Sequence, residues 1–317
     1  NVKDLHQQTQ RIGNKKIEYE YDLVSGNVNE VHYQKGSLDQ FAHKYEYDAD
    51  NRLTEVFTSR DGMIWDNDAS YKYYLHGPQA RIELGQDSVQ GLDYAYTLQG
   101  WIKGMNSASL QQDYDIGQDG MLGHANANFG KDEVGYILNY HQTDFETIYP
   151  NAITQRKFET NLNNQDLRPG LYNGNIRSMI TSINKFMTSG QPSGYSYTYD
   201  QLNRIKGMEY HNDFDQTSNQ WNSFTVNPNY RSSYNYDPNG NIISLERDAI
   251  DGVGNPLPMD RFSYNYTTNS NQLTHVNDPI SASNYDNDID GQNPGNYSYD
   301  RIGNLIKAAC LLPIAGV

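Results

Sequence analysis

Five aspartates directly follow the second tyrosine of a Tyr-x-Tyr pair, and a carboxylate beside a phenol is a pair of groups that general acid–base catalysis can use. They are Asp22, Asp48, Asp200, Asp237 and Asp300. Each is followed three or four residues later by glycine or asparagine, as in a turn whose amides need a nearby acceptor. Because the same arrangement recurs so often, we interpret these aspartates as turn residues and predict that none is catalytic.

A second group of carboxylates lies near the C-terminal end. Asp286, Asp288 and Asp290 alternate with other residues, and Gly291 follows in sixth position, as in the first half of an EF-hand calcium loop. The twelfth position is Tyr297 instead of the bidentate glutamate, and no helical pattern flanks the segment. Two interpretations stay open, a weak calcium site and an Asp/Asn-rich surface loop.

The remaining reactive residue types form no local motif. The chain has 8 histidines, with no pair spaced i, i+2 or i, i+4, so we expect no local zinc motif. Cys310 is the only cysteine, which excludes an internal disulfide and a cysteine-based zinc site. Trp65 and Trp221 lie in connecting loops, where they either stack on sugars or pack against the sheet. We therefore predict no enzyme and no bound cofactor apart from the calcium candidate.

The composition points to strands and turns. The 317 residues include 27 Tyr and 26 Gly, the mean hydropathy is −0.85, and 12% of the residues are aromatic. Tyrosine favours strands, while Asn, Asp and Gly favour turns. A formal net charge of −15 argues against nucleic acid and anionic lipid as partners. The most apolar run has ten residues, Ala308 to Val317, which is too short to insert into a membrane.

The tyrosine–aspartate pairs belong to a phrase that repeats along the chain. Its most regular copy, residues 234–242, reads Tyr-x-Tyr-Asp-Pro-Asn-Gly-Asn-Ile. The second tyrosines of the seven copies are Tyr21, Tyr47, Tyr96, Tyr199, Tyr236, Tyr266 and Tyr299. Tyr73 marks a degenerate eighth copy. Such repetition indicates an array of similar structural units.

Each copy predicts a β-hairpin. Residues two apart lie on one face of a strand, so each Tyr-x-Tyr presents two rings to the same side. Pro238 suits the first corner of a type I turn, and Gly240 suits the left-handed residue that follows. The aliphatic residue two positions later opens the returning strand. One hairpin is marginal alone, so we expect many to stack and to bury a continuous face.

Up to Tyr96 and again from Tyr199 onward, the copies recur at irregular intervals of 23 to 37 residues, which is unlike the steady period of a β-propeller. We predict one array over residues 1–307, with 107–170 as an irregular insertion in the sheet, and an atypical apolar tail over 308–317. Residues 178–187 fit a helix or a strand equally well.

The repeated Tyr-Asp-x-x-Gly-Asn-Leu/Ile phrase resembles the YD repeat of the Rhs family. Its relatives are bacterial polymorphic toxins, the C components of insecticidal toxin complexes and animal teneurins. Residues 96–106 and 171–179 look like Rhs proteins of the Bacteroidetes type. The resemblance implies an all-β fold in which stacked hairpins form a spiralling β-strip, part of a hollow cocoon or shell. The chain departs from the pattern in its C-terminal part, which shows neither a core-associated segment nor a toxin.

The resemblance also implies a function, that of a secreted or surface-delivered bacterial shell segment. Its partners would be its own C-terminal toxin or other cargo and a secretion machinery. An alternative is a surface adhesin, whose exposed aromatic side chains contact carbohydrate on another cell. Glycan binding by the isolated chain would favour the adhesin, and a reading frame that continues into a toxin would favour the shell.

Overall fold

The computed structural model describes residues 3–9, 13–145, 158, 170–186, 192–221, 227–281, 284–285 and 289–308. These residues form antiparallel strands joined by turns, with one 3-10 helix, Asn184–Phe186, in the described part of the chain. None of the described helices is both long and apolar enough to cross a membrane. The all-β fold of stacked hairpins is therefore confirmed. The chain divides into two compact units.

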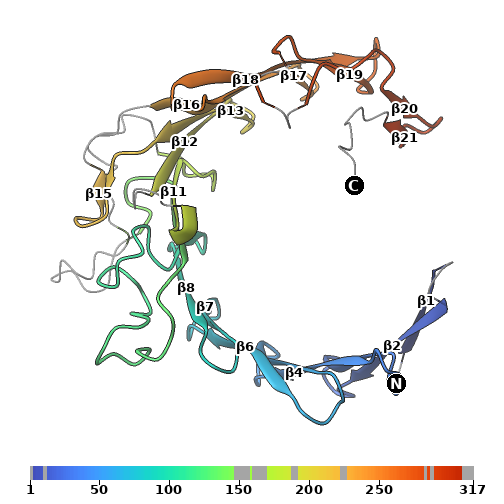
Figure 1. Ribbon diagram of the computed structural model, residues 1–317, viewed down its shortest axis with the longest axis vertical. Coiled ribbons are helices and arrows are strands. Elements are labelled where there is room, and N and C mark those ends of the chain that lie inside the picture. Colours follow the sequence, from blue (N-terminus) through green and yellow to red (C-terminus); the bar gives the residue numbers. More distant parts are fainter. Residues whose placement is uncertain are drawn as a thin grey trace. The chain divides into compact units, whose positions relative to one another are not determined.

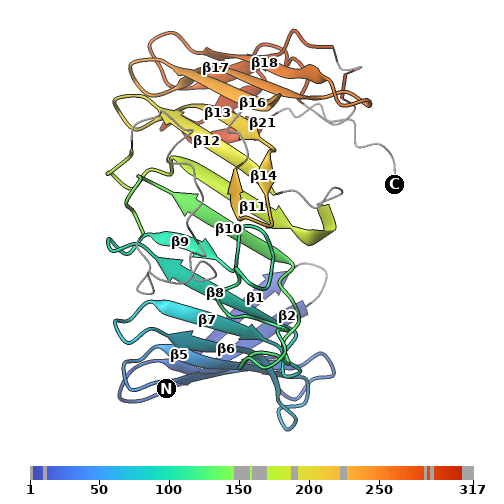
Figure 2. The ribbon, with the colours of Figure 1, turned by 90° about the vertical axis from the view of Figure 1, so that its left-hand side faces the viewer.

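Unit 1 comprises residues 1–137, 144–159 and 182–190. Its strands pair in the order of the chain, each antiparallel to the next (Figures 1 and 2). They are β1 (Lys3–Thr9), β2 (Gly13–Tyr21), β3 (Val28–Tyr33), β4 (Phe41–Tyr47), β5 (Leu53–Ser59), β6 (Asp66–Tyr73), β7 (Gln79–Leu84), β8 (Gln90–Tyr96), β9 (Ile102–Met105) and β10 (Val134–Asn139), the last two residues of which belong to unit 2.

Unit 2 comprises residues 138–143, 160–181 and 191–317. Its main sheet again pairs neighbours along the chain, and β14–β15 and β20–β21 form two separate pairs. The strands are β11 (Ser178–Ile183), the last two residues of which belong to unit 1, β12 (Ser193–Tyr199), β13 (Ile205–His211), β14 (Phe214–Asp215), β15 (Gln220–Trp221), β16 (Asn227–Tyr236), β17 (Ile242–Ile250), β18 (Pro256–Tyr266), β19 (Leu273–Asn277), β20 (Tyr297–Tyr299) and β21 (Leu305–Ala308). Residues 178–183 are thus a strand, which resolves one of the open alternatives.

The repeated phrase forms the hairpin corners as predicted. At the corner between β16 and β17, the backbone N–H of Gly240 donates to the carbonyl of Asp237 at 3.1 Å. The Asp237 carboxylate accepts the backbone N–H of Asn241 at 2.8 Å, so the aspartate holds the turn from within. Gly240 has φ +92°, and the asparagines in the same position of other copies, Asn51 and Asn203, have φ +61° and +63°. A β-bulge precedes the second tyrosine and completes the corner.

In several copies the second tyrosine of the phrase also joins one hairpin to the preceding one. The hydroxyl of Tyr47 donates to the carbonyl of Val28 at 2.9 Å, and that of Tyr236 donates to Ile205 at 2.8 Å. Val28 and Ile205 each open the returning strand of the hairpin before. The same bond recurs at Tyr73–Leu53, Tyr266–Ile242 and Tyr299–Leu273. The phenol therefore fixes the register between successive repeats in both units.

Residues 107–133 of the expected insertion form turns between β9 and β10. Several of their side chains are completely buried, among them Ser107, Ala108 and Asp119. Beyond residue 145, the structure describes residues 158 and 170 of the expected insertion. Residues 107–133 pack onto the sheet of unit 1 through buried side chains such as Asp119.

Candidate functional site

Unit 1 presents an aromatic face along its sheet. The pairing registers place Tyr19 beside Val31, Tyr45 beside Val56 and Tyr71 beside Ile82. We define the aromatic face by nine of the residues on this side from β2 to β8, which are Ile17, Tyr19, Val31, Tyr45, Val56, Tyr71, Ile82, Leu92 and Tyr94. All nine side chains are half-buried. Partial burial raises the pKa values of the Tyr45 and Tyr94 hydroxyls.

The opposite side of the same sheet is a charged face. Its residues alternate in sequence with those of the aromatic face, and many of them form ion pairs. Lys16 contacts Glu18 at 2.9 Å, and Lys44 contacts Glu46 at 2.7 Å. The two faces therefore differ in what they can contact. The ion pairs of the charged face are compatible with water, whereas the tyrosines of the aromatic face offer apolar rings that each carry a hydroxyl group.

Arg81, at one end of the charged face, holds the insertion against the sheet. Its guanidinium donates to Asp93 on β8 and, at 2.8 Å, to Asp119 of the insertion. All three side chains are buried. A Cβ on Gly91 or Gly117 would collide with this group, so the absence of a side chain at both positions is what lets the insertion approach. Buried pairs of this kind fix geometry more than they add stability.

Two further buried carboxylates lie beside this group. Burial raises the pKa of Asp132 to about 9, with the nearby carboxylate of Asp115 as the next cause. Burial likewise raises the pKa of Asp93 to about 7, although Arg81 opposes the shift. Among the residues that the structure describes, no N–H donor reaches the side-chain oxygens of Asp132, and its contact with the carboxyl group of Asp115 raises its pKa further. Protonation of Asp132 therefore relieves part of the negative charge buried beneath the insertion.

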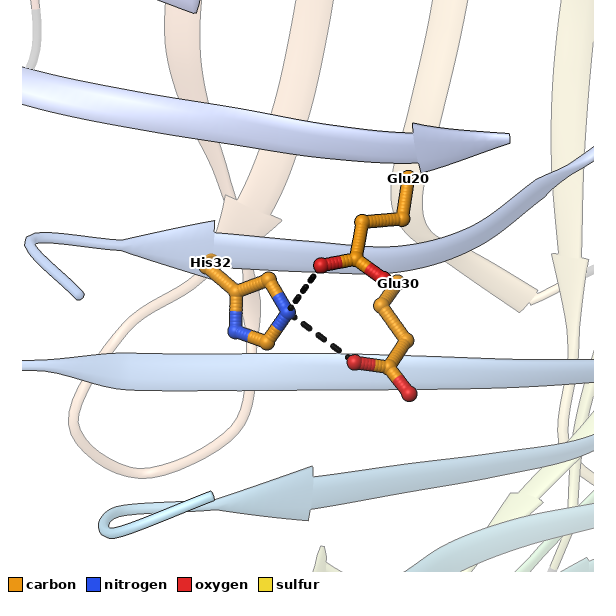
Figure 3. Close-up of side chains that lie close together, drawn as sticks. All are labelled: Glu20, Glu30 and His32. Carbon is orange, nitrogen blue, oxygen red and sulfur yellow. Dashed lines mark ion pairs between the residues drawn. The ribbon is translucent and has the colours of Figure 1, made fainter. Parts of the chain in front are cut away.

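The charged face also brings together Glu20, Glu30 and His32 on β2 and β3 (Figure 3). Nε2 of His32 lies 2.9 Å from Oε2 of Glu30 and 3.4 Å from Oε1 of Glu20. Glu20 and Glu30 are direct partners across the strands, and His32 follows Glu30 by two residues. Within the described ranges, these are the residues whose Asp, Glu, His and Cys ligand atoms converge closely enough to hold a metal ion.

A cavity of about 290 Å³ opens beside this cluster. Residues of β3, β4 and the two loops that follow β3 and β5 line it, including Glu30, His32, Lys35, Gln40, Ser59 and Arg60. Polar side chains share the lining with apolar groups such as Phe41, Ala42 and Met63. The polar members nearest the cluster can contact water, an ion or a small polar group.

The aspartates of the repeated phrase occupy the turns that the sequence predicts. The Arg52 side chain, followed by its backbone N–H, lowers the pKa of Asp48, and the Asn241 side chain lowers that of Asp237. Each carboxylate thus accepts hydrogen bonds within its own turn. This is the structural role that we inferred from their repetition.

The other predicted candidates have mixed outcomes. Asp286 and Asp288 of the calcium candidate lie outside the described residues, as does Cys310, while Asp290 is exposed. Trp65 is half-buried in the loop between β5 and β6. Trp221 lies in β15 and not in a connecting loop as expected. It is 4% exposed and packs edge-on against Phe214, with 5.2 Å between ring centroids. Packing, one of the two alternatives for these tryptophans, therefore holds for Trp221.

Comparisons with known proteins give only distant structural matches. No family model and no curated protein matches the chain. The chain is similar to solved structures described as TcdB2-TccC3-TEV and as the Photorhabdus luminescens Tc holotoxin pore. Both show 10% identity and a TM-score of 0.33, over 96% of this chain and 16% of the other. A porin-like protein from Bacteroides uniformis shows 7% identity and a TM-score of 0.24, over 81% and 92% of the two chains. Likenesses this weak carry no argument about function.

Proposed function

We propose that the chain is a non-enzymatic shell segment of the Rhs type, whose aromatic face lines a space around a cargo polypeptide. The half-exposed aromatic face of unit 1 is the observation that carries the proposal. A continuous apolar surface of this kind is unusual on a protein that works alone in water, and it marks a surface that contacts something else.

The two faces of the sheet support this orientation. The charged face satisfies its own groups through pairs such as Lys16–Glu18 and Lys44–Glu46, and these remain favourable in contact with water. The tyrosines of the other face combine a large apolar ring with a hydroxyl that can donate to a polypeptide backbone. Such a surface can contact many sequences without requiring one of them, which is what a container for a variable cargo needs.

The repeat architecture supplies the wall. Each hairpin pairs its strands with its neighbours, so the backbone hydrogen bonds of most strands are satisfied within the array. Tyrosine hydroxyls such as that of Tyr236 bind each repeat to the preceding one, and the array can lengthen without new kinds of contact. We propose a C-terminal toxin or another unfolded polypeptide as the cargo, delivered by a secretion machinery to the outside of a bacterial cell.

Hydroxyl-radical footprinting tests the proposal. The isolated chain is compared with the protein encoded by the complete reading frame in which it lies. We expect Tyr45 and Tyr71 to be oxidised several-fold more slowly in the complete protein, because the cargo covers them. Leu75 is a matched control, since its side chain is fully exposed at a hairpin corner and should react equally in both. Equal oxidation of the two tyrosines in both proteins would refute the enclosing role.

A glycan array separates the shell from the adhesin alternative. Saturable binding of the isolated chain to a glycan, abolished by Trp65→Ala, would favour the adhesin. A shell segment should give no such signal. Because Trp221 is buried, the half-buried Trp65 is the tryptophan of this pair that could stack on a sugar.

A further inference from the structure

The geometry of the β2–β3 hairpin points to a site that neither the repeat nor the shell requires. We propose that Glu20, Glu30 and His32 bind one zinc ion on the charged face, with an open coordination position toward the adjoining cavity. The proposal is independent of the shell function, because it concerns side chains that point away from the aromatic face.

The spacing of the three ligand atoms fits a small tetrahedral ion. Zinc binds imidazole nitrogen and carboxylate oxygen at about 2.0–2.2 Å, which separates two tetrahedral ligand atoms by about 3.3 Å. Nε2 of His32 lies 3.4 Å from the nearer Glu20 oxygen and 2.9 Å from that of Glu30. Shifts of a few tenths of an ångström therefore suffice to admit the ion. Strand pairing holds the three side chains in this arrangement.

Exposure differs among the three ligands in a way that suits a bound ion. The His32 side chain is 8% exposed, and the side chains of Glu30 and Glu20 are 29% and 46% exposed. The imidazole is thus fixed within the sheet while the carboxylates face outward. Glu30 and His32 also line the cavity of about 290 Å³. A water molecule or a small anionic group in that cavity can complete the coordination shell.

Lys35 provides independent evidence that the cluster attracts a cation. Its ammonium group lies 3.3 Å from Oε1 of Glu20 and 3.5 Å from Nε2 of His32. The ammonium thus approaches the region that the three ligand atoms share. Because the Lys35 side chain is 53% exposed, it can move aside into water at little cost when a divalent ion binds.

The donor set selects the class of metal. One imidazole nitrogen with two carboxylate oxygens matches the ligands that zinc takes in sites with three protein ligands. Calcium prefers six to eight oxygen ligands, and magnesium keeps several waters in an octahedral shell, so neither uses an imidazole readily. Among zinc, calcium and magnesium, zinc is therefore the ion that this cluster should favour.

Calorimetric titration of the complete chain with zinc chloride, after treatment with a chelator, tests the proposal. We expect one ion per chain, and at least about tenfold weaker binding for both Glu30→Gln and His32→Gln. Glu46→Gln is a matched control on the charged face, since Glu46 pairs with Lys44 outside the cluster, and it should bind zinc like the wild type. Lys35→Met should bind zinc more tightly, because it removes the competing ammonium group.

Cobalt substitution keeps the proposal testable if a ligand variant fails to fold. Co²⁺ added to the wild-type chain should give the intense visible absorption of a four-coordinate ion, and an equivalent of zinc should abolish it. The proposal is overturned if the wild type shows no saturable zinc binding, or if Glu30→Gln and His32→Gln both bind as the wild type does. A weak octahedral cobalt spectrum, or weaker zinc binding by Lys35→Met, would likewise contradict it.

Discussion

Gly240 offers a direct test of the hairpin corner, because its substitution changes the backbone without a collision. Its φ of +92° lies in the region that residues with a side chain rarely adopt. A Cβ at this position would meet only the Arg204 guanidinium, at 3.9 Å, which is an ordinary contact. Any loss of stability in Gly240→Val must therefore come from the backbone conformation, since there is room for the side chain.

The expected loss follows from the cost of a left-handed conformation. For an ordinary L-residue this cost is about 1–2 kcal/mol, and a β-branched side chain stands at the upper end because its rotamers are restricted. A change of this size corresponds to a factor of about 5–30 in the equilibrium between closed and open hairpin. Gly240→Asn is the matched control, since Asn51 and Asn203 adopt φ values near +60° at the same position of the phrase.

Amide hydrogen exchange is the suitable assay, because repeat arrays open locally and a single melting temperature would average over many hairpins. The amides of Gly240 and Asn241 donate within this hairpin corner. We expect them to exchange about 5–30 times faster in Gly240→Val, and to change much less in Gly240→Asn. The amide of Asn51, in a corner of unit 1, serves as an internal reference. Unchanged exchange in Gly240→Val would refute the assigned turn.

Three further predictions concern the contacts between elements. Tyr236→Phe removes the hydroxyl that donates to the carbonyl of Ile205, and should destabilise the β13–β16 pairing by about 1 kcal/mol, measured by amide exchange. Arg81→Met leaves the buried carboxylate of Asp119 without its cation and should cost about 3–5 kcal/mol, measured by denaturant unfolding; a loss below 1 kcal/mol would contradict the anchoring role. Because the pKa of Asp132 is raised from 3.8 to about 9, its neutral form stabilises the fold, fully below pH 3.8 and progressively less up to about pH 9. The melting temperature of the wild type should therefore fall over this range, and Asp132→Asn should flatten the curve; parallel curves would contradict this assignment.

The hairpins were predictable from the sequence because each is specified within about ten residues. A tyrosine, an aspartate and a glycine or asparagine at fixed spacing determine the strand face, the turn acceptor and the left-handed corner. Even the degenerate copy at Tyr73 forms the corner between β6 and β7, with Gly77 at φ +113°. Residues 178–183 escaped assignment because their short apolar pattern is compatible with both periods.

The clusters could not be predicted in the same way, because their members meet only through strand register. Glu20 and Glu30 face each other only once the bulge before Tyr21 has set the pairing, and a search for nearby histidine pairs cannot find them. Placing Tyr21 opposite Val28 would by itself put Glu20 opposite Asn29, and the extra residue of the bulge is what aligns Glu20 with Glu30. Arg81 and Asp119 are 38 residues apart, with irregular chain between them, and no local pattern connects them.

The position of the insertion bears on which face of the sheet is free to meet a cargo. Arg81 and Asp93 belong to the charged face, and through Asp119 they hold residues of the 107–133 segment against it. Residues 107–133, which have no regular secondary structure, thus lie on the charged face of unit 1. Polar side chains of that face can form hydrogen bonds with the backbone of this segment. Were this side turned toward an enclosed space, the insertion would occupy the volume that a cargo needs. No residue of this segment is held against the half-buried tyrosines of the aromatic face by Arg81. Burial of these tyrosines by a bound polypeptide would also give a larger favourable hydrophobic free energy than burial of the charged face. The insertion on the charged face therefore supports the proposal that the aromatic face receives the cargo.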